Sequence, residues 1–478
     1  MDSCQKRCRK STSTNYHSRA RYRRVLVPKK VNGNQEDHKQ YCMSAYEWPP
    51  AVLRGLGSVM SKPFGHSLNC VKSRTEYLGP CLLVGFLLEA IIAKSRFDGF
   101  IGGWRGHMIL TVAMLALLLA RGVWIRLREP FYFAPPRPVG IVLAIACAWA
   151  VICCIMQSNA YANLVFLSVF AANIYVCLYI APNLVLPYLG ERSVLLYALP
   201  IFAVSVLNLV VDTEPASQGS PYWRLAGVTD NATQSGILGA MGAILALWMV
   251  LQWNRRRPVW FAIWILCVMA LLMTRTRASI VGWAIGSTAM VFYWARNSVA
   301  AHLKWPVAVT LLLASMLVGL GTVAYPEFIS PTRQYLRASD WEELIRSRAK
   351  PWEMGFANAA EHPWFGEGPM ARFSNTNDPT NVDAYDVHRV YCSTWLAFAQ
   401  AYGILGSLLF ALLCFIMVLS ATRRQVAFPL LLVGLMFSCI VSSIGSSWVV
   451  SFGMPGDRAT WLILGLALAV PAREHSEG

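Results

Sequence analysis

The chain has 478 residues, of which 56% are hydrophobic and only 14% are charged. This composition excludes an ordinary soluble globular protein and predicts an all-α integral membrane protein. The formal net charge is +17, and residues 1–75 contain 15 Lys and Arg against 4 Asp and Glu. Most of the excess positive charge therefore lies in one polar segment ahead of the apolar sequence.

We expect residues 1–75 to form a disordered cytoplasmic tail. This basic segment has no apolar run of the kind that a signal peptide contains. Contact with anionic lipid or with nucleic acid is the alternative use of such a segment. We expect the tail to fix orientation, with no nucleic acid as a partner.

The 13 cysteines do not predict a disulfide framework. Most of them lie within apolar runs or in the basic tail, and only Cys392 lies near the large polar loop described below. We expect the cysteines to act as small apolar packing residues.

Hydropathy predicts about twelve membrane-spanning helices of roughly the 20 residues that a bilayer requires. Nine of them lie within 76–324 and three within 403–478, and one polar loop, 325–402, separates the two groups. The predicted spans are 77–93, 107–125, 138–156, 161–180, 193–211, 236–252, 259–273, 278–294, 306–324, 403–420, 427–447 and 458–471.

The positions of Lys and Arg between the spans predict the orientation, because cytoplasmic loops carry an excess of both residues. With the tail inside, the basic loops at 121–137, 255–257, 296–304 and 423–424 are all cytoplasmic. Both termini are then cytoplasmic, and the large loop lies on the opposite face. No internal repeat is evident, so an inverted-repeat transporter has no support.

The large loop contains signals for helices and turns. Asp340 and Glu343 have the spacing of a capping box, and Pro351 suits the first turn of a second helix. A His-Pro pair ends that second helix, and the sequence GEGP at 366–369 predicts a tight turn.

An aromatic ladder closes the loop. Tyr391, Trp395, Phe398 and Tyr402 have spacings that place their rings on one face of a helix. We expect this helix to lie at the membrane surface and to be broken at Gly403, ahead of the next span.

The arginines on the face opposite to the cytoplasmic loops include Arg224, Arg275, Arg277 and Arg348. Arginine presents a fork of donors to phosphate oxygens and stays charged, so this group suits a diphosphate. Each arginine has a structural alternative, such as an interfacial position for Arg224 or an ion pair along its helix for Arg348. On the same face, His388 is able to take a proton near neutral pH, although a single His ahead of a helix is more often structural.

At these residues the chain resembles the O-antigen ligase/polymerase superfamily. That superfamily contains lipopolysaccharide O-antigen ligases, Wzy-type polysaccharide polymerases and bacterial O-oligosaccharyltransferases. The similarity covers about residues 222–410, and Arg389 and Ala401 depart from the usual Asn and acidic residue of the family. The similar segments are 222–231 (YWRLAGVTDN), 274–279 (TRTRAS), 348–369 (R…W…HPWFGEGP) and 388–406 (HRVY…AYGILG).

The resemblance implies a GT-C-like enzyme of the bacterial inner membrane with its active site in the periplasm. The donor would be a glycan on undecaprenyl diphosphate. The acceptor would be a hydroxyl of lipid A core, of a growing polysaccharide or of a protein. Transfer would be inverting and would use no metal and no other cofactor.

The resemblance also implies roles for the candidate residues. Arg277 and Arg348 would hold the diphosphate, with Arg224 and Arg275 assisting. His388 would activate the acceptor hydroxyl, oriented by Asp386. The flat indoles of Trp352, Trp364 and Trp395 would contact sugar rings or the isoprenyl chain, and packing in the protein core is an equally good use of these three.

Two other classes compete with a transferase. A transporter or flippase of lipid-linked glycans is expected to carry ionisable residues in mid-span, and these are scarce, because Glu89 lies near the end of its span and Arg121 near an interface. A structural membrane protein whose basic tail recruits a partner is the third hypothesis.

Overall fold

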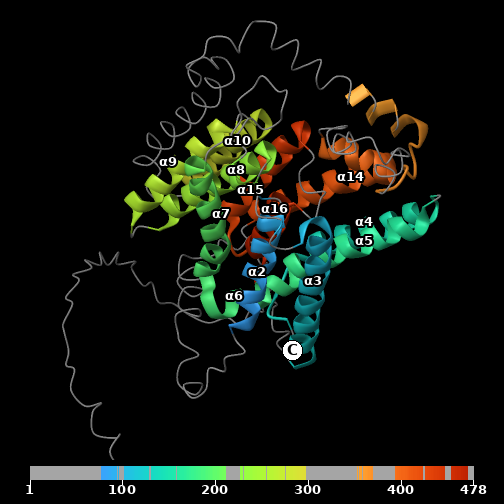
Figure 1. Ribbon diagram of the computed structural model, residues 1–478, viewed down its shortest axis with the longest axis horizontal. Coiled ribbons are helices and arrows are strands. Elements are labelled where there is room, and N and C mark those ends of the chain that lie inside the picture. Colours follow the sequence, from blue (N-terminus) through green and yellow to red (C-terminus); the bar gives the residue numbers. More distant parts are fainter. Residues whose placement is uncertain are drawn as a thin grey trace, which may run out of the picture. The chain divides into compact units, whose positions relative to one another are not determined.

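The computed structural model is built almost entirely of helices in the part of the chain that it describes (Figure 1). The statements below concern only the residues described, and these belong to a single compact unit within 66–478. They are 77–93, 95, 99, 102–128, 131–157, 159–211, 227–229, 231–253, 256–274, 276–297, 352–353, 355–357, 359–369, 393–423, 426–446 and 454–471.

The described elements are almost all α-helices, which confirms the all-α part of the predicted fold class, whereas the large periplasmic loop stays a prediction. A π-turn, two 3-10 turns and one pair of two-residue strands complete the set. In chain order the elements are α2 (Leu78–Ala93), α3 (Gly103–Arg128), β1 (Phe133–Ala134), α4 (Arg137–Ile155), α5 (Ala160–Tyr175), η3 (Val176–Ile180), α6 (Ala181–Leu189), η4 (Gly190–Arg192), α7 (Ser193–Val210), η5 (Gly227–Thr229), α8 (Ala232–Gln252), α9 (Arg257–Met273), α10 (Arg277–Arg296), α14 (Thr394–Thr422), α15 (Pro429–Gly445), α16 (Pro455–Leu468) and β2 (Val470–Pro471).

Helices occupy eleven of the twelve predicted ranges, and the remaining range, 306–324, lies outside the described residues. Six helical stretches are long and apolar enough to cross a membrane, and α2, α9 and α15 are shorter apolar helices. The chain is therefore a multi-pass membrane protein, and the total of twelve spans stays a prediction.

The starts of these helices follow from local sequence. A proline occupies the first or second position of α4, α9, α15 and α16, where its missing N–H costs no hydrogen bond. Asn231 caps α8, because its side-chain oxygen accepts from the backbone N–H of Thr233 at 2.9 Å and of Gln234 at 3.3 Å.

One expected connection is helical instead. The predicted break between the spans 161–180 and 193–211 is filled by α6 and η4, so the helical path runs with little interruption from α5 through η3 to α7. Asn183 in α6 explains part of this order. Its side chain binds both the backbone N–H of Phe133, at 2.9 Å, and the carbonyl of that residue, at 2.6 Å.

Two short strands depart from a purely helical fold. β1 pairs antiparallel with β2, so the segment between α3 and α4 is joined to the residues that follow α16. The α14–α15 connection meets the same place, because the Ala427 N–H donates to the Ala469 carbonyl at 2.8 Å.

The core of the bundle is formed by α8 and α16. Every residue of α16 is buried, and α8 is buried over almost its whole length. α16 packs against η3, α2, α6, α7, α8 and α15, while α10 packs along α15 and α8 along α9 (Figure 1). The span predicted at 458–471 is therefore the central helix, and it begins three residues earlier, at Pro455.

Hydrogen bonds gather one end of many helices into a polar layer. They join the ends of α7 and α15 to the starts of α8, α10, α14 and α16, which are the ends that the charge pattern places on one face. The donor–acceptor pairs are Asn208 Nδ2 to Ser235 Oγ, Thr276 Oγ1 to the Ala232 carbonyl, the Gly456 N–H to Gln234 Oε1, Ser442 Oγ to the Ala278 carbonyl, Ser393 Oγ to the Ser443 carbonyl and Thr394 Oγ1 to the Ser446 carbonyl.

Candidate functional site

Helix α14 is sharply bent at Gly403, where the backbone has φ 72° and ψ −179°. Ser407 Oγ donates to the Trp395 carbonyl at 2.7 Å across the bend. In a straight helix twelve residues would span about 18 Å, so the two parts of α14 must fold back on each other. The predicted break at Gly403 is confirmed.

The aromatic ladder was expected to lie at the membrane surface, but its described rings pack inside the protein. The ring of Phe398 stacks on Phe410 with centroids 4.5 Å apart, and the ring of Trp395 lies 5.1 Å from that of Phe410. Tyr402 is buried. These rings therefore pack onto the second part of α14 inside the protein, because the bend turns their face inward.

The turn predicted at 366–369, with the residues ahead of it, docks directly on this bend. The Glu367 N–H donates to the Gln400 carbonyl at 2.7 Å, and the Ile404 N–H donates to the Pro363 carbonyl at 2.9 Å. Gln400 Nε2 also donates to Glu367 Oε2, at 2.9 Å. Residues 359–369 are thus held to α14 by backbone and side-chain bonds on both sides of Gly403.

Helix α4 and the residue that follows it contact both the docked turn and the bend of α14. Gln157, just beyond α4, donates from Nε2 to the Phe365 carbonyl at 2.8 Å and to the Gly366 carbonyl at 3.2 Å. Trp149 Nε1 donates to the Tyr402 carbonyl at 2.9 Å. This hydrogen bond satisfies a carbonyl at the bend of α14. The Trp149 ring stacks on Phe365 with centroids 5.6 Å apart.

Glycines permit this close docking. Gly366 has φ 66°, and a Cβ there would lie 2.3 Å from the Gln400 carbonyl oxygen. A Cβ on Gly403 would lie 2.1 Å from the Trp364 carbonyl oxygen. Both contacts are with backbone, so a side chain would force the turn away from α14.

We therefore expect Gly366→Ala to undock the turn. Hydrogen exchange of residues 359–369 should become much faster in the purified variant. Gly103→Ala is the matched control, because Gly103 has φ 61° but a Cβ there meets nothing within 4 Å. The control should carry only the left-handed backbone penalty of about 1–2 kcal/mol. Unchanged exchange in Gly366→Ala would contradict the docking.

Arg277 is the one predicted phosphate ligand that the described residues include. It is the first residue of α10 and is exposed. Thr276, ahead of it, makes no side-chain cap, so the first N–H groups of α10 are not capped by that side chain. Ser279 is fully buried, and its Oγ finds no partner within the described part of the chain.

Helices α10 and α14 both begin at the same end of α15. Ser442 Oγ of α15 donates to the Ala278 carbonyl at 3.1 Å, and the neighbouring Ser443 carbonyl accepts from Ser393 at 3.4 Å. The structure thus brings the start of α10 and the start of α14 to one end of α15.

The predicted tryptophans have three different surroundings. Trp364 is 71% exposed, Trp352 is half-buried, and Trp395 packs on Phe410. Only Trp364 presents a free indole face, whereas Trp395 serves as a packing residue. The other predicted site residues, Arg224, Arg275, Arg348, Asp386 and His388, lie outside the described residues.

Sequence reasoning missed a buried ionic cluster. Arg458 of α16 binds Glu89 of α2 and the Phe86 carbonyl through Nη1, and Thr111 of α3 through Nη2 at 3.1 Å. His107 Nδ1 contacts the other oxygen of Glu89. All four polar side chains are almost completely buried.

An ionisable residue within an apolar run is a signal for such a cluster. The sequence identified Glu89 as an ionisable residue near the end of its span. Arg458 and His107 are also ionisable residues at the edges of predicted spans. Ionisable groups are therefore less scarce inside the bundle than expected, although neither of the two described cavities is lined by them.

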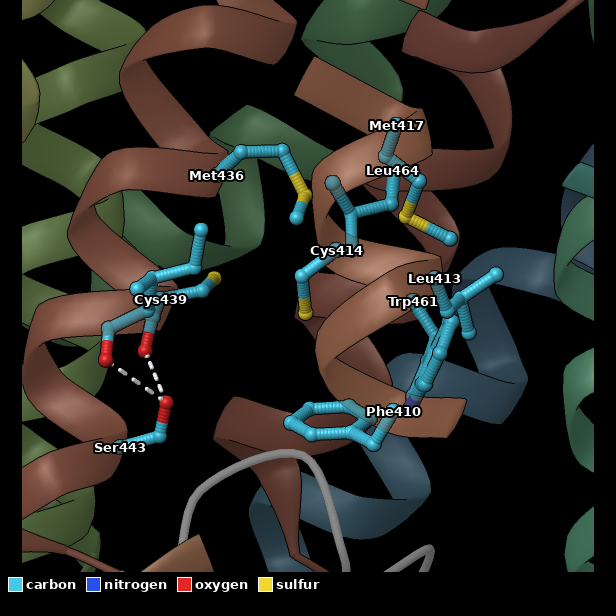
Figure 2. A pocket seen from close by; sticks show the side chains of 10 residues that line it. Phe410, Leu413, Cys414, Met417, Met436, Cys439, Ser443, Trp461 and Leu464 are labelled. Atoms are coloured by element: carbon cyan, nitrogen blue, oxygen red, sulfur yellow. Dashed lines mark hydrogen bonds between the residues drawn. The ribbon is translucent and has the colours of Figure 1, made fainter. Parts of the chain in front are cut away.

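Two small apolar cavities flank α14. One, of about 60 Å³, lies between α4, α5 and α14 and is lined by Trp149, Tyr402 and Trp461 among others. The other, of about 20 Å³, lies between α14, α15 and α16 (Figure 2). Figure 2 shows Cys414 and Cys439 at the second cavity, where they act as the expected apolar packing residues.

A possible cation site lies on the docked turn, although the sequence predicted no metal. Glu361, His362 and Glu367 each offer a ligand atom, and these atoms lie within 4.8 Å of one another. Within the described residues this is the group of His, Cys, Asp and Glu side chains that meets the spacing of a metal site.

Comparison with known families supports the resemblance found in the sequence. Residues 261–411 match the family model described as O-antigen ligase. A search of curated proteins gave no match. The matched region runs from α9 to the second part of α14 and includes Arg277, the docked turn and the bend at Gly403.

Proposed function

We propose that this chain, in which residues 261–411 form an O-antigen ligase domain, transfers a glycan from an undecaprenyl-diphosphate carrier to an acceptor hydroxyl. The reaction would take place at the periplasmic face of the bacterial inner membrane, with both termini in the cytoplasm. The observation that supports this best is the position of Arg277 at the start of α10, at the end of α15 where α14 also begins, within the matched domain.

The start of α10 suits the leaving diphosphate. A helix N-terminus attracts anions through its free N–H groups and its dipole, and Arg277 adds a charged fork of donors at that place. The buried Ser279 hydroxyl is a further donor on the same turn. With Arg348, and with Arg224 and Arg275 assisting, these groups would stabilise the charge that develops on the leaving group without a metal.

His388 would act as the base. The acceptor oxygen attacks the anomeric carbon, the bond from that carbon to the diphosphate breaks with inversion, and His388 takes the hydroxyl proton. Asp386 would orient the imidazole. Four residues separate His388 from Ser393, and the five steps of chain between them span at most about 18 Å. This limit keeps His388 near the start of α14.

Apolar surface near the docked turn suits the rest of the donor. The cavity of about 60 Å³ beside Trp149 and Tyr402 would take part of the isoprenyl chain. The exposed indole of Trp364 would stack on a sugar ring, and the half-buried Trp352 would line the same region.

The test is transfer in detergent micelles, where a membrane with two compartments no longer exists. The purified full chain is given an undecaprenyl-diphosphate-linked glycan together with lipid A core, polysaccharide or protein as acceptor. A transferase yields a glycosylated acceptor and free undecaprenyl diphosphate, whereas a flippase yields neither. His388→Ala should lower the rate about 10²–10⁴-fold, the usual contribution of a general base.

A wild-type rate in His388→Ala would contradict the assigned role of that residue. An absence of product with all three acceptors, from protein that remains folded, would favour the flippase. The acceptor that is glycosylated distinguishes ligase, polymerase and protein O-oligosaccharyltransferase.

A further inference from the structure

The docked turn carries three side chains of types that commonly bind metal ions. Glu361 and His362 are exposed and Glu367 is half-buried, and their ligand atoms lie within 4.8 Å of one another. One imidazole nitrogen with two carboxylate oxygens is a ligand set for a divalent transition-metal ion, with room for water as a further ligand.

The charges around these side chains favour a cation. An ionised carboxylate only accepts hydrogen bonds, so the neighbouring oxygens of Glu361 and Glu367 repel each other and are stabilised by a cation more than by water alone. Residues 359–361 end a helical segment, and the C-terminal end of a helix is the negative end of its dipole. A carboxylate at this position is therefore disfavoured unless a positive charge lies beside it.

Gln400 provides an independent observation. Its side chain is only 3% exposed, and its Nε2 donates to Glu367 Oε2 at 2.9 Å. The other end of the amide, Oε1, is buried and has no hydrogen-bond partner in the described ranges. The side chain that binds Glu367 thus also carries a buried acceptor that lacks a donor, and a cation or a water molecule bound to one would satisfy it.

The bond from Gln400 also fixes one oxygen of Glu367. Metal-ligating carboxylates are usually oriented by a hydrogen bond from a neighbouring side chain in this manner. Because Gln400 lies on α14, a cation held by Glu367 and by residues 361–362 would fasten the turn to that helix.

We propose that Glu361, His362 and Glu367 bind one divalent transition-metal cation, with Gln400 orienting Glu367. The imidazole favours zinc over magnesium or calcium, both of which prefer oxygen ligands alone. The cation holds residues 359–369 against α14 and takes no part in the transfer step, so the site is independent of the proposed function.

The alternative is an imidazolium ion pair. A protonated His362 between the two glutamates would balance part of their charge without any metal. This arrangement predicts no bound zinc and no stabilisation by zinc, so measurement of binding separates the two.

The test uses the full chain, purified in detergent with an affinity tag that contains no histidine. Equilibrium dialysis against zinc, followed by elemental analysis, gives the number of ions bound. We expect Glu367→Gln and His362→Ala each to lose one equivalent relative to the wild type. Gln400→Ala should bind zinc about 10–100-fold more weakly, as for other outer partners of metal ligands.

Glu353→Gln is the matched control, because Glu353 is an exposed carboxylate of the same loop outside the group. It should bind zinc as the wild type does. Zinc should also slow hydrogen exchange of residues 359–369 in the wild type, and magnesium at the same concentration should not. Equal zinc binding by the wild type and both ligand variants would overturn the proposal, as would zinc binding without any effect on exchange of the turn.

Discussion

Replacing Arg277 by alanine is expected to lower the rate of glycan transfer by about 10²–10³-fold. This is the usual cost of removing one fixed donor from developing negative charge. Arg277 is exposed at the start of α10, so its removal leaves no cavity and little effect on stability is expected. Arg277→Lys should recover part of the rate, because it keeps the charge but loses the fork of donors.

The matched control for this prediction is Arg296→Ala. Arg296 lies on the same helix and is also exposed, but it is the last residue of α10, at the opposite end. Initial rates in micelles, with thermal unfolding of each purified variant, make the comparison. A wild-type rate in Arg277→Ala, or an equal loss in both variants, would remove Arg277 from the diphosphate site.

Replacing Arg458 by leucine is expected to destabilise the protein by about 3–5 kcal/mol, because Glu89 would be left as a buried charge without its main partner. Glu89→Leu should destabilise the protein to a similar extent, because Arg458 would then be the buried charge without a partner. The double variant should be much more stable than the sum of the two losses predicts, since apolar residues can replace a buried ion pair at little cost.

A double-mutant cycle of unfolding in detergent measures this coupling. Glu191→Leu and Arg192→Leu form the matched control, because both residues are exposed. These control variants should change stability by less than about 0.5 kcal/mol each. Strictly additive effects at Glu89 and Arg458 would show that their ion pair does not stabilise the bundle.

The sequence predicted those parts of the fold that depend on local signals. Apolar runs placed the helices, and glycine placed the bend at Gly403 and the tight turn at 366–369. In each case the cause lies within a few residues of the effect, either as hydropathy or as a backbone angle that other residues rarely adopt.

Contacts between distant segments were beyond this reasoning. Arg458 and Glu89 are 369 positions apart, and neither residue indicates which helix its partner occupies. The same limit explains the aromatic ladder: spacing placed the rings on one face, but the partner of that face, Phe410, is set by the bend.

The sequence identified the segments of the candidate site, but not the residues that hold these segments in place. Arg277 and the turn at 366–369 were selected as functional, whereas Gln157 and Gln400, which hold the turn in place, were not. Each is a single polar side chain without a motif, so only the folded structure shows what it binds.

The central helix α16 is anchored at both of its ends. At one end Arg458 is tied to α2 and α3, and at the other β2 is paired with β1 while Ala469 accepts from Ala427. Because α16 is bonded to other elements at both ends, we expect it not to shift along its own axis. We therefore expect relative movement of helices in this bundle to involve outer helices such as α4 and α5, while α16 keeps its position.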